Sequence, residues 1–218
     1  MEQNHKPYEG LFVTIEGGDG CGKSTLSDHL TQELTKRGYP VFKTREPGGT
    51  PLSEKIRNLL LKPDADYTIA PRAELLLYLA ARAQNVEECI KPALYKGQVV
   101  ICERFNDSTI AYQGCARNLG MQFVEKLCNL LCDGPDFTLF LDLDPAIGMN
   151  RVKAERKQPF DRLEQEKLQF HKEVRQGYLH LADEHPQRIV VIDASQPLEQ
   201  VVEAAWKALE PRLGRVFK

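Results

Sequence analysis

The sequence has no apolar run long enough to cross a membrane and no excess of charge of one sign. Its 29 Lys and Arg nearly balance 31 Asp and Glu, and the net charge of −2 gives no general attraction to nucleic acid or to an anionic membrane. Residues 1–9 are polar and lack the apolar segment of a secretion signal. We therefore expect a cytoplasmic protein with neither a nucleic-acid nor a membrane partner.

The cysteines are not spaced for metal binding or for a redox motif. None of the six belongs to a C-x-x-C pair, and most lie within apolar segments. Cys128 and Cys132 would share a helix face, but the sequence offers no further zinc ligands beside them. Thiols that serve as small core residues are typical of a reduced compartment. Because there is no internal repeat and no low-complexity linker, we expect a single domain, 1–218, with its core at about 10–210.

What the sequence does contain is a phosphate-binding motif near its start. Residues 17–24, GGDGCGKS, match G-x-x-x-x-G-K-S, follow the β-branched run 11–15 and precede a helical segment at 25–37. Glycines let backbone N–H groups wrap around a phosphate, and the helix N-terminus presents further N–H groups and a positive dipole to the same anion. Lys23 would reach the β- and γ-phosphates, and the Ser24 hydroxyl would bind Mg²⁺. The predicted nucleotide-binding residues are Gly17, Gly18, Asp19, Gly20, Cys21, Gly22, Lys23, Ser24 and Thr25.

Apolar, β-branched runs alternate with helical segments along the chain. The predicted strands are 11–15, 40–44, 98–102, 137–143 and 188–192. The predicted helices are 25–37, 52–61, 71–95 with a kink near Pro92, 121–132, one that begins at Pro145, 161–182 and 198–209. This alternation predicts an α/β protein with the P-loop NTPase fold, in which a five-stranded parallel sheet is covered by helices on both faces in three α/β/α layers.

Charged residues follow two of the predicted strands. Arg45 and Glu46 follow the second strand, Glu103 and Arg104 follow the third, and the carboxyl ends of parallel strands meet at one edge of a sheet. The two arginines are candidates to bind a phosphate, although a surface salt bridge is the alternative for each. The candidate Mg²⁺ ligands are Ser24, Asp19, Glu46 and Glu103.

Three further segments have two interpretations each. Tyr78 and Arg82 share a face of the long helix, where they could stack on a base and bind its edge, or could be a core residue and a solvated charge. The basic segment 150–162 could be a mobile lid that brings cations to the transferred phosphoryl group, or a solvated helix face. The run 140–144, FLDLD, could be a Walker-B strand or a strand end that faces solvent.

Four motifs together resemble the thymidylate kinase family over residues 11–209. They are the P-loop with Asp19, the stretch 45–50 (REPGGT), the stretch 103–105 (ERF) followed by 111–114 (AYQG), and the stretch 161–166 (DRLEQE). The resemblance implies a P-loop nucleoside-monophosphate kinase that passes the γ-phosphoryl group of ATP to dTMP, giving dTDP and ADP, in dTTP biosynthesis. It also implies Mg²⁺ as a cofactor and a homodimer.

The resemblance also implies roles for individual residues. Arg45 and Arg104 correspond to arginines that hold the dTMP phosphate, and Tyr78 stands where the family usually has a phenylalanine stacked on thymine. Arg82 and Gln113 match base-reading positions. The implied substrate-binding residues are Arg45, Glu46, Pro47, Arg57, Tyr78, Arg82, Arg104, Thr109, Tyr112 near the sugar 2′ carbon, Gln113 and Tyr178. The implied catalytic residues are Lys23, Asp19, Arg45, Glu103, Arg104, Arg156 and Arg162, and Arg151 joins the nucleotide-binding set.

The chain departs from the family's pattern at two places. The usual Asp-Arg-aromatic motif is Glu103-Arg104-Phe105, so that the acidic side chain is one methylene longer. Gly20 follows Asp19 where one subgroup has an arginine in its P-loop, and the basic lid is that of the other subgroup, which is typical of bacteria. We therefore expect the catalytic cations to come from the lid at about 150–162.

Two other functions compete with this one. A kinase for another pyrimidine monophosphate would share the fold and the arginines at the strand ends. A nucleotide-switch GTPase would share the P-loop, but the sequence has no N-K-x-D motif to read guanine, and the arginines suit a second substrate that carries a phosphate. ADP release that requires dTMP would separate a kinase from a switch, which hydrolyses its nucleotide in either case.

Overall fold

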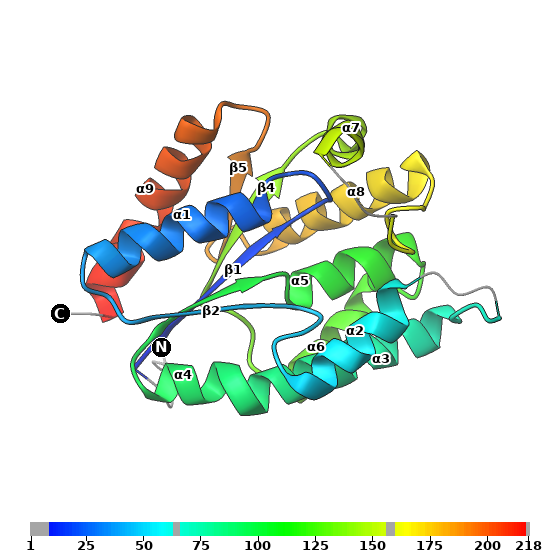
Figure 1. Cartoon of the computed structure of the whole chain (residues 1–218), viewed down its shortest axis with the longest axis horizontal. Coiled ribbons are helices and arrows are strands. Elements are labelled where there is room, and N and C mark those ends of the chain that lie inside the picture. Colours follow the sequence, from blue (N-terminus) through cyan, green and yellow to red (C-terminus); the bar gives the residue numbers. More distant parts are fainter. Residues whose placement is uncertain (1–8, 63–65, 156–159, 217–218) are drawn as a thin grey trace.

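The fold is built on the five-stranded parallel sheet that the sequence predicts, with its strands in the order β2-β3-β1-β4-β5 (Figure 1). The computed structural model describes residues 9–62, 66–155 and 160–216. The strands are β1 (Leu11–Gly17), β2 (Val41–Arg45), β3 (Val99–Glu103), β4 (Phe137–Asp142) and β5 (Ile189–Asp193). Because every neighbouring pair is parallel, with Ile15 beside Glu103 and Glu103 beside Arg45, the functional strand ends lie at one edge.

The central strand β1 is buried along its whole length, which explains its continuous apolar sequence. Successive side chains of a strand point to opposite faces. Leu11, Val13 and Ile15 therefore pack into one apolar cluster, whereas Phe12 packs into another on the opposite face. The sheet thus has a core on each side and needs helices on both.

Helices cover both faces of this sheet. They are α1 (Lys23–Lys36), α2 (Pro51–Leu61), α3 (Pro71–Asn85), the π-helix η1 (Val86–Ile90), α4 (Lys91–Tyr95), α5 (Asn106–Thr109), the π-helix η2 (Ile110–Ala116), α6 (Met121–Leu131), α7 (Pro145–Glu155), α8 (Leu168–Glu184) and α9 (Leu198–Val216). Helices α1 and α9 pack on one face, while α3, η2 and α8 belong to the core of the other (Figure 1). Within the described ranges, no helix is both long and apolar enough to cross a membrane.

Three predicted helices differ from those observed. The last of them, predicted at 198–209, continues through Pro211 to Val216. The helix predicted at 71–95 changes at 86–90 to π-helical bonding, in which the Lys91 N–H bonds to the Val86 carbonyl; this irregularity lies directly before Pro92, which has no N–H to donate. The helix predicted from Asp161 begins instead at Leu168. The residues expected to form its first helical turn adopt non-helical turns instead. The reason is that the Asp161 carboxylate accepts the N–H groups of Leu163 and Glu164, both at 2.9 Å.

A helical segment at 106–116 was not predicted. It consists of the short helix α5 and the wider turns of η2, and it places Ser108, Thr109, Tyr112 and Gln113 beside the carboxyl ends of the strands. The Arg117 N–H bonds to the Tyr112 carbonyl, five residues earlier, so the segment has no regular α-helical period for sequence reasoning to find.

Candidate active site

The carboxyl ends of the central strands open into a cavity of about 280 Å³. The predicted residues that line it are Asp19, Lys23, Ser24, Arg45, Glu46, Pro47, Arg57, Tyr78, Arg82, Glu103, Arg104, Thr109, Tyr112 and Gln113. The residues that line it without having been predicted are Leu61, Ser108, Asp161, Leu163 and Glu164. The predicted residues that do not line it are Gly17, Gly18, Gly20, Cys21, Gly22, Thr25, Arg151, Arg162 and Tyr178. Arg156 lies outside the described residues.

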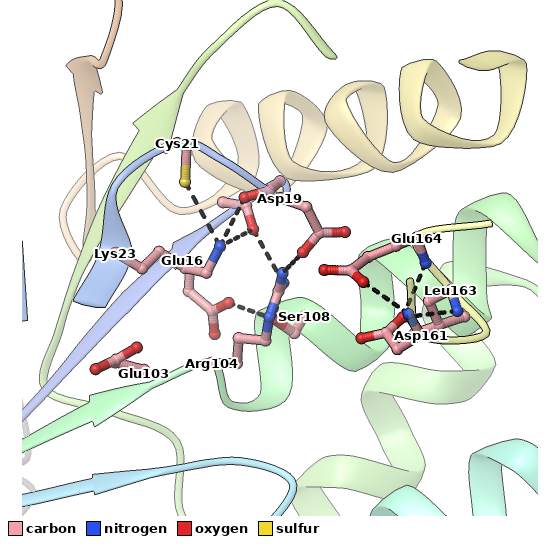
Figure 2. Close-up of polar contacts among 12 residues, drawn as sticks. Glu16, Asp19, Cys21, Lys23, Glu103, Arg104, Ser108, Asp161, Leu163 and Glu164 are labelled. Carbon is pink, nitrogen blue, oxygen red and sulfur yellow. Dashed lines mark hydrogen bonds and ion pairs between the residues drawn. The ribbon is translucent and has the colours of Figure 1, made fainter. Parts of the chain in front are cut away.

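The P-loop is wrapped around its own lysine (Figure 2). Lys23 Nζ donates to the carbonyls of Gly18 at 2.6 Å and Gly17 at 3.2 Å, and it lies 3.6 Å from Cys21 Sγ. Gly22, with a φ of 94°, turns the chain into α1 in a conformation that favours glycine. The first N–H groups of a helix need acceptors outside it, so the loop combines these donors with an ammonium group in one anion site.

The residue after Asp19 is glycine for a steric reason. Gly20 has a φ of 72°, and a Cβ at this position would clash with the Gly148 carbonyl in α7. A Cβ at Gly148 would in turn clash with the Asp19 carbonyl. The P-loop and α7 therefore pack backbone to backbone, which excludes the P-loop arginine of the other subgroup and places the start of the lid beside the nucleotide loop.

Arg104 connects the P-loop to the rest of the cavity. Its Nη2 lies 2.6 Å from Asp19 Oδ1, and its Nη1 donates to the Gly17 carbonyl at 2.9 Å (Figure 2). The guanidinium also lies 5.1 Å from the centre of the Tyr112 ring. Its backbone has a φ of 65°, a left-handed conformation that costs energy for a residue other than glycine and is kept only where the surroundings enforce it.

Glu16 is a buried carboxylate beside the P-loop that the sequence analysis did not single out. Its carboxylate accepts the Phe105 N–H and the Ser108 hydroxyl, both at 2.6 Å, and the Tyr178 hydroxyl at 3.0 Å. Burial and the nearby Asp107 carboxylate raise the pKa of Glu16. Tyr178, predicted as a substrate contact, lies 3.4 Å from Arg104 Nη1 through its hydroxyl oxygen and does not line the cavity. An acidic residue inside an apolar strand, directly before the P-loop, was the signal that could have identified this site.

Two arginines form a cationic pocket at the end of β2. Arg45 Nη1 and Arg57 Nη1 both donate to the Pro47 carbonyl, at 3.0 and 2.9 Å, and Arg45 also pairs with Glu54 at 3.1 Å. Burial and the adjacent Arg45 lower the pKa of Arg57. An anion bound between the two guanidinium groups would relieve this repulsion, so the pair is suited to a phosphate. We call Arg45 and Arg57 the arginine pair.

Oxygen atoms that could bind a divalent cation lie at the start of α1. Ser24 Oγ donates to Glu103 Oε2 at 2.7 Å, which brings a hydroxyl and a carboxylate together beside the P-loop. Lys43 Nζ lies 3.3 Å from Glu103 Oε1 and 2.6 Å from Asp28 Oδ1. Hard oxygen donors next to a phosphate site suit Mg²⁺, which usually takes one or two carboxylates and completes its shell with water and phosphate.

Glu46, predicted as a metal ligand, is fully engaged with neighbouring side chains. Arg82 Nε donates to its Oε2 at 2.7 Å, Asn85 Nδ2 donates to its Oε1 at 3.1 Å, and the Glu46 side chain is only 3% exposed. Burial lowers the pKa of Arg82, but Glu46 outweighs this effect and raises it above its usual value. These contacts favour a role for Glu46 in fixing Arg82 over a role in binding a metal.

A buried pocket of polar and aromatic groups lies farther from the P-loop. Arg82 Nη2 donates to Thr109 Oγ1 at 2.8 Å, and Gln113 Nε2 donates to Glu74 Oε1 at 2.8 Å. Burial and Glu74 raise the pKa of Tyr78, so its ring carries a neutral phenol. We call Tyr78, Arg82, Thr109 and Gln113 the base pocket, because a flat ring with several edge groups fits these side chains.

The described lid arginines point away from the cavity. Arg162 donates through Nε to the Leu60 carbonyl at 2.9 Å and lies 2.5 Å from Glu74 Oε2, and Arg151 donates to the Ala194 carbonyl at 3.2 Å. The Walker-B interpretation of 140–144 is not favoured either, because Asp142 forms a two-point contact with Arg175, at 2.7 and 2.8 Å, and does not line the cavity.

The fold and the cavity define the class of the protein. A P-loop with oxygen ligands beside it binds a nucleoside triphosphate. A nucleotide-switch protein binds no second nucleotide, so it would not need a second cationic pocket joined to a base pocket. Since the P-loop residues, the arginine pair and the base pocket line one cavity, the geometry is that of a P-loop kinase whose acceptor is itself a small nucleotide.

Comparison with known proteins identifies the family. The sequence model of thymidylate kinase matches residues 15–205. A thymidylate kinase from Protochlamydia amoebophila is 49% identical over 210 residues, 93% of each chain, and one from Enterococcus faecalis is 45% identical over 212 residues, 96% of this chain and 100% of that one. The crystal structure of thymidylate kinase from Ehrlichia chaffeensis superposes with a TM-score of 0.74 at 34% identity, over 92% of this chain and 98% of that one. The chain belongs to the thymidylate kinase family and is a nucleoside-monophosphate kinase, which confirms the resemblance seen in the sequence.

Proposed function

We propose that the chain transfers the γ-phosphoryl group of ATP to dTMP, giving dTDP and ADP, in dTTP biosynthesis. The observation that supports this reaction best is the single cavity that joins Lys23 and Ser24 of the P-loop to the arginine pair and the base pocket. Phosphoryl transfer depends mainly on positioning and on charge stabilisation. One cavity that orients both substrates provides the first, and its cations provide the second.

The acceptor phosphate lies between the arginine pair and Arg104. These three guanidinium groups come from different elements, and each lines the cavity. Arg104 also bonds to Asp19 and to the Gly17 carbonyl, so it holds the acceptor in a fixed relation to the P-loop. Pro47 aligns the arginine pair through its carbonyl.

The base of the acceptor lies on Tyr78, with its edge toward Arg82 and Gln113. A guanidinium can only donate hydrogen bonds, which suits the O4 acceptor of thymine and suits the N4 amino group of cytosine poorly. Glu46 and Thr109 hold Arg82 in place for this contact. Tyr112 is buried beside Arg104 and crowds the sugar, so a 2′-hydroxyl is disfavoured.

Mg²⁺ is the proposed cofactor, with Ser24 and Glu103 as its protein ligands and Asp19 as a third candidate. When bound, the ion neutralises charge on the phosphates as the bond to the leaving oxygen weakens. The longer Glu103, in place of the family's usual aspartate, reaches Ser24 directly at 2.7 Å. Lys23 holds the terminal phosphates of ATP, and Arg151, which donates to the Ala194 carbonyl, is the proposed lid contact with the nucleotide.

We further propose a cytoplasmic homodimer that has no nucleic-acid partner. The near-neutral net charge of −2 supports the absence of general attraction to nucleic acid. Exposed leucines and a phenylalanine on α3 and α6 support self-association, and the Discussion gives its test.

The test is a measurement of ADP release with MgATP and a panel of nucleoside monophosphates. The predicted order of kcat/KM is dTMP, then dUMP, with UMP and dCMP far behind, because a missing 5-methyl costs only roughly 10-fold whereas mismatched polar groups cost more. Phosphorylation of dCMP or UMP as fast as dTMP would identify a general pyrimidine monophosphate kinase. ADP release that does not depend on any acceptor would identify a switch protein instead.

A further inference from the structure

Glu74 is a fully buried carboxylate beside the base pocket. It lies on α3, one turn before Tyr78, with 0% of its surface exposed. Its Oε1 accepts from Gln113 Nε2 at 2.8 Å and from Arg117 Nε at 3.3 Å, and its Oε2 lies 2.5 Å from Arg162 Nη2. Two guanidinium groups therefore neutralise its charge, while its remaining contact is with a predicted base-reading residue.

The contact with Glu74 determines which end of the Gln113 amide faces the cavity. A glutamine amide can donate from its nitrogen or accept at its oxygen, and the two ends differ little in shape. A carboxylate only accepts, so Gln113 must direct Nε2 toward Glu74. Gln113 is 1% exposed and lines the cavity, and within the described ranges no hydrogen bond reaches its Oε1. The atom left for a ligand is therefore an acceptor.

This orientation matches one class of base. Thymine and uracil carry a hydrogen on N3, next to the O4 acceptor, whereas cytosine has an acceptor at N3, next to an amino group. Arg82 presents donors and Gln113 presents an acceptor, which is the complement of O4 and N3–H. An amide turned the other way would present donors only and would donate to the N3 acceptor of cytosine.

We propose that Glu74 is a positioning residue that sets base selectivity by fixing the Gln113 amide. The proposal rests on the proposed function, because it takes dTMP as the acceptor. The ion pairs with Arg117 and Arg162 keep the carboxylate in place, but they do not require Gln113 to donate to it. Selectivity is thus supplied by a residue that does not line the cavity.

The test compares Glu74→Gln with Arg117→Gln. Glu74→Gln keeps the size of the side chain but offers both a donor and an acceptor, so the Gln113 amide is free to turn. We expect the ratio of kcat/KM for dTMP to that for dCMP to fall about 10-fold, as the loss of one buried polar match implies. Arg117→Gln removes an ion pair with Glu74 but keeps its bond to Gln113, so the ratio should stay at the wild-type value.

A second ligand and a second background make the result specific to Gln113. N3-methyl-dTMP lacks the N3 hydrogen, so its penalty relative to dTMP should be smaller in Glu74→Gln than in the wild type. In a Gln113→Ala background, Glu74→Gln should no longer change the dTMP to dCMP ratio, because a pair that acts through one contact is not additive. An additional change in that background would overturn the proposal.

Glu74→Gln leaves two partly buried arginines without this carboxylate, so its fold is checked by circular dichroism and thermal unfolding. If it does not fold, the double variant Glu74→Gln, Arg117→Gln is compared with Arg117→Gln alone, since it removes one of the two guanidinium groups that lose their ion pair with Glu74. An unchanged dTMP to dCMP ratio in a folded variant overturns the role of Glu74. A wild type that does not phosphorylate dTMP would instead refute the proposed function, so the two failures are distinguishable.

Discussion

At the scale of single residues, we expect Lys23 to contribute most to turnover. Its ammonium group bonds to the Gly17 and Gly18 carbonyls, so it already sits inside the loop that would hold the phosphates. Lys23→Ala should lower kcat for ADP release by ~10²-fold or more, because a preorganised charge is lost from the transition state. The melting temperature should change little. Lys91→Ala, which removes an exposed lysine paired with Glu87, should keep the wild-type kcat.

A near-normal kcat in Lys23→Ala would show that the P-loop is not the site of phosphoryl transfer. The interpretation holds only if the Lys91→Ala control behaves like the wild type, since both variants lose one positive charge.

Glu16 should make the free energy of unfolding depend on pH, with a sign that follows from the surroundings of its carboxyl group. Burial and Asp107 raise the pKa of Glu16 above the usual value. A carboxyl with a raised pKa in the folded state stabilises the fold below its unfolded pKa of about 4.3 and loses this contribution as the pH rises through the folded pKa. The free energy of unfolding of the wild type, minus that of Glu16→Gln, should therefore be largest below about pH 4 and should decrease above it.

Urea unfolding of both proteins between about pH 3.5 and 8 measures this difference. A difference that grows as the pH rises would mean that the hydrogen bonds from Phe105, Ser108 and Tyr178 favour the charged carboxylate more strongly than burial opposes it.

At the scale of elements, we expect the arginines of the lid to have two different roles. Arg162 is held by Glu74 and by the Leu60 carbonyl, so Arg162→Ala should act mainly by raising KM for dTMP and lowering the melting temperature. Arg156, outside the described residues, and Arg151 are then the candidates for the transferred phosphoryl group. At least one of Arg151→Ala and Arg156→Ala should lower kcat more than it raises KM.

Steady-state kinetics for the three arginine variants tests this division. If all of them show only a raised KM, the lid supplies binding and not transition-state stabilisation, and the expectation that catalytic cations come from the lid is wrong.

The elements that could be predicted are those with a regular period or a strong terminal signal. The inner strands β3, β1 and β4 were found because parallel strands buried on both faces are continuous apolar runs, whereas β2 and β5 lie at the edges of the sheet and are partly exposed. The charged residues that follow β2 and β3 indicated one shared edge. The start of α8 was misplaced because the Asp161 side chain competes for backbone N–H groups, which no periodicity reveals. Helical residues 106–116 were missed because π-helical turns do not follow the α-helical period.

The residues of the site were predictable where the type of residue alone indicates chemistry, as with Arg45 and Arg104. Their partners were not. The bonds that join Glu46 to Arg82 and Glu74 to Gln113 span 36 and 39 positions of sequence. Whether an acidic residue binds a metal or holds an arginine depends on which side chains surround it after folding, and the order of residues along the chain does not contain that information.

At the scale of the whole molecule, two neighbouring helices present apolar stripes to the outside. Leu76 on α3 is 63% exposed, and Phe123 and Leu130 on α6 are 54% and 80% exposed. The helices contact each other and lie on the same side of the molecule (Figure 1). Leu76 and Ala80 are four residues apart and both exposed, so they share one face of α3. Helix α3 therefore has one apolar stripe that is buried and another that is exposed. Exposed apolar patches of this kind mark interaction surfaces, which supports a homodimer through α3 and α6.

Leu130→Glu should convert a dimer into a monomer of 24.7 kDa in sedimentation at micromolar concentration. A charge buried in an apolar interface without a partner is strongly unfavourable. Leu198→Glu changes a leucine that is 41% exposed on α9, away from both helices, and should leave the mass unchanged. A wild type that sediments only as a monomer would contradict the proposed homodimer.

Each of the three apolar clusters contains at least one buried free cysteine, whose reactivity can report on that part of the molecule. The buried thiols are Cys21 in the cluster beneath α1, Cys128 in the cluster around η2, and Cys102 and Cys132 in the cluster of η1 and α4. A buried thiol reacts with a bulky reagent only when its surroundings open. Once the partly exposed Cys89 and Cys115 have reacted, the reaction rates of the buried thiols measure how often three separate parts of the molecule open. A nucleotide that tightens the P-loop would slow Cys21 alone, whereas an acceptor held by the base pocket would slow Cys128.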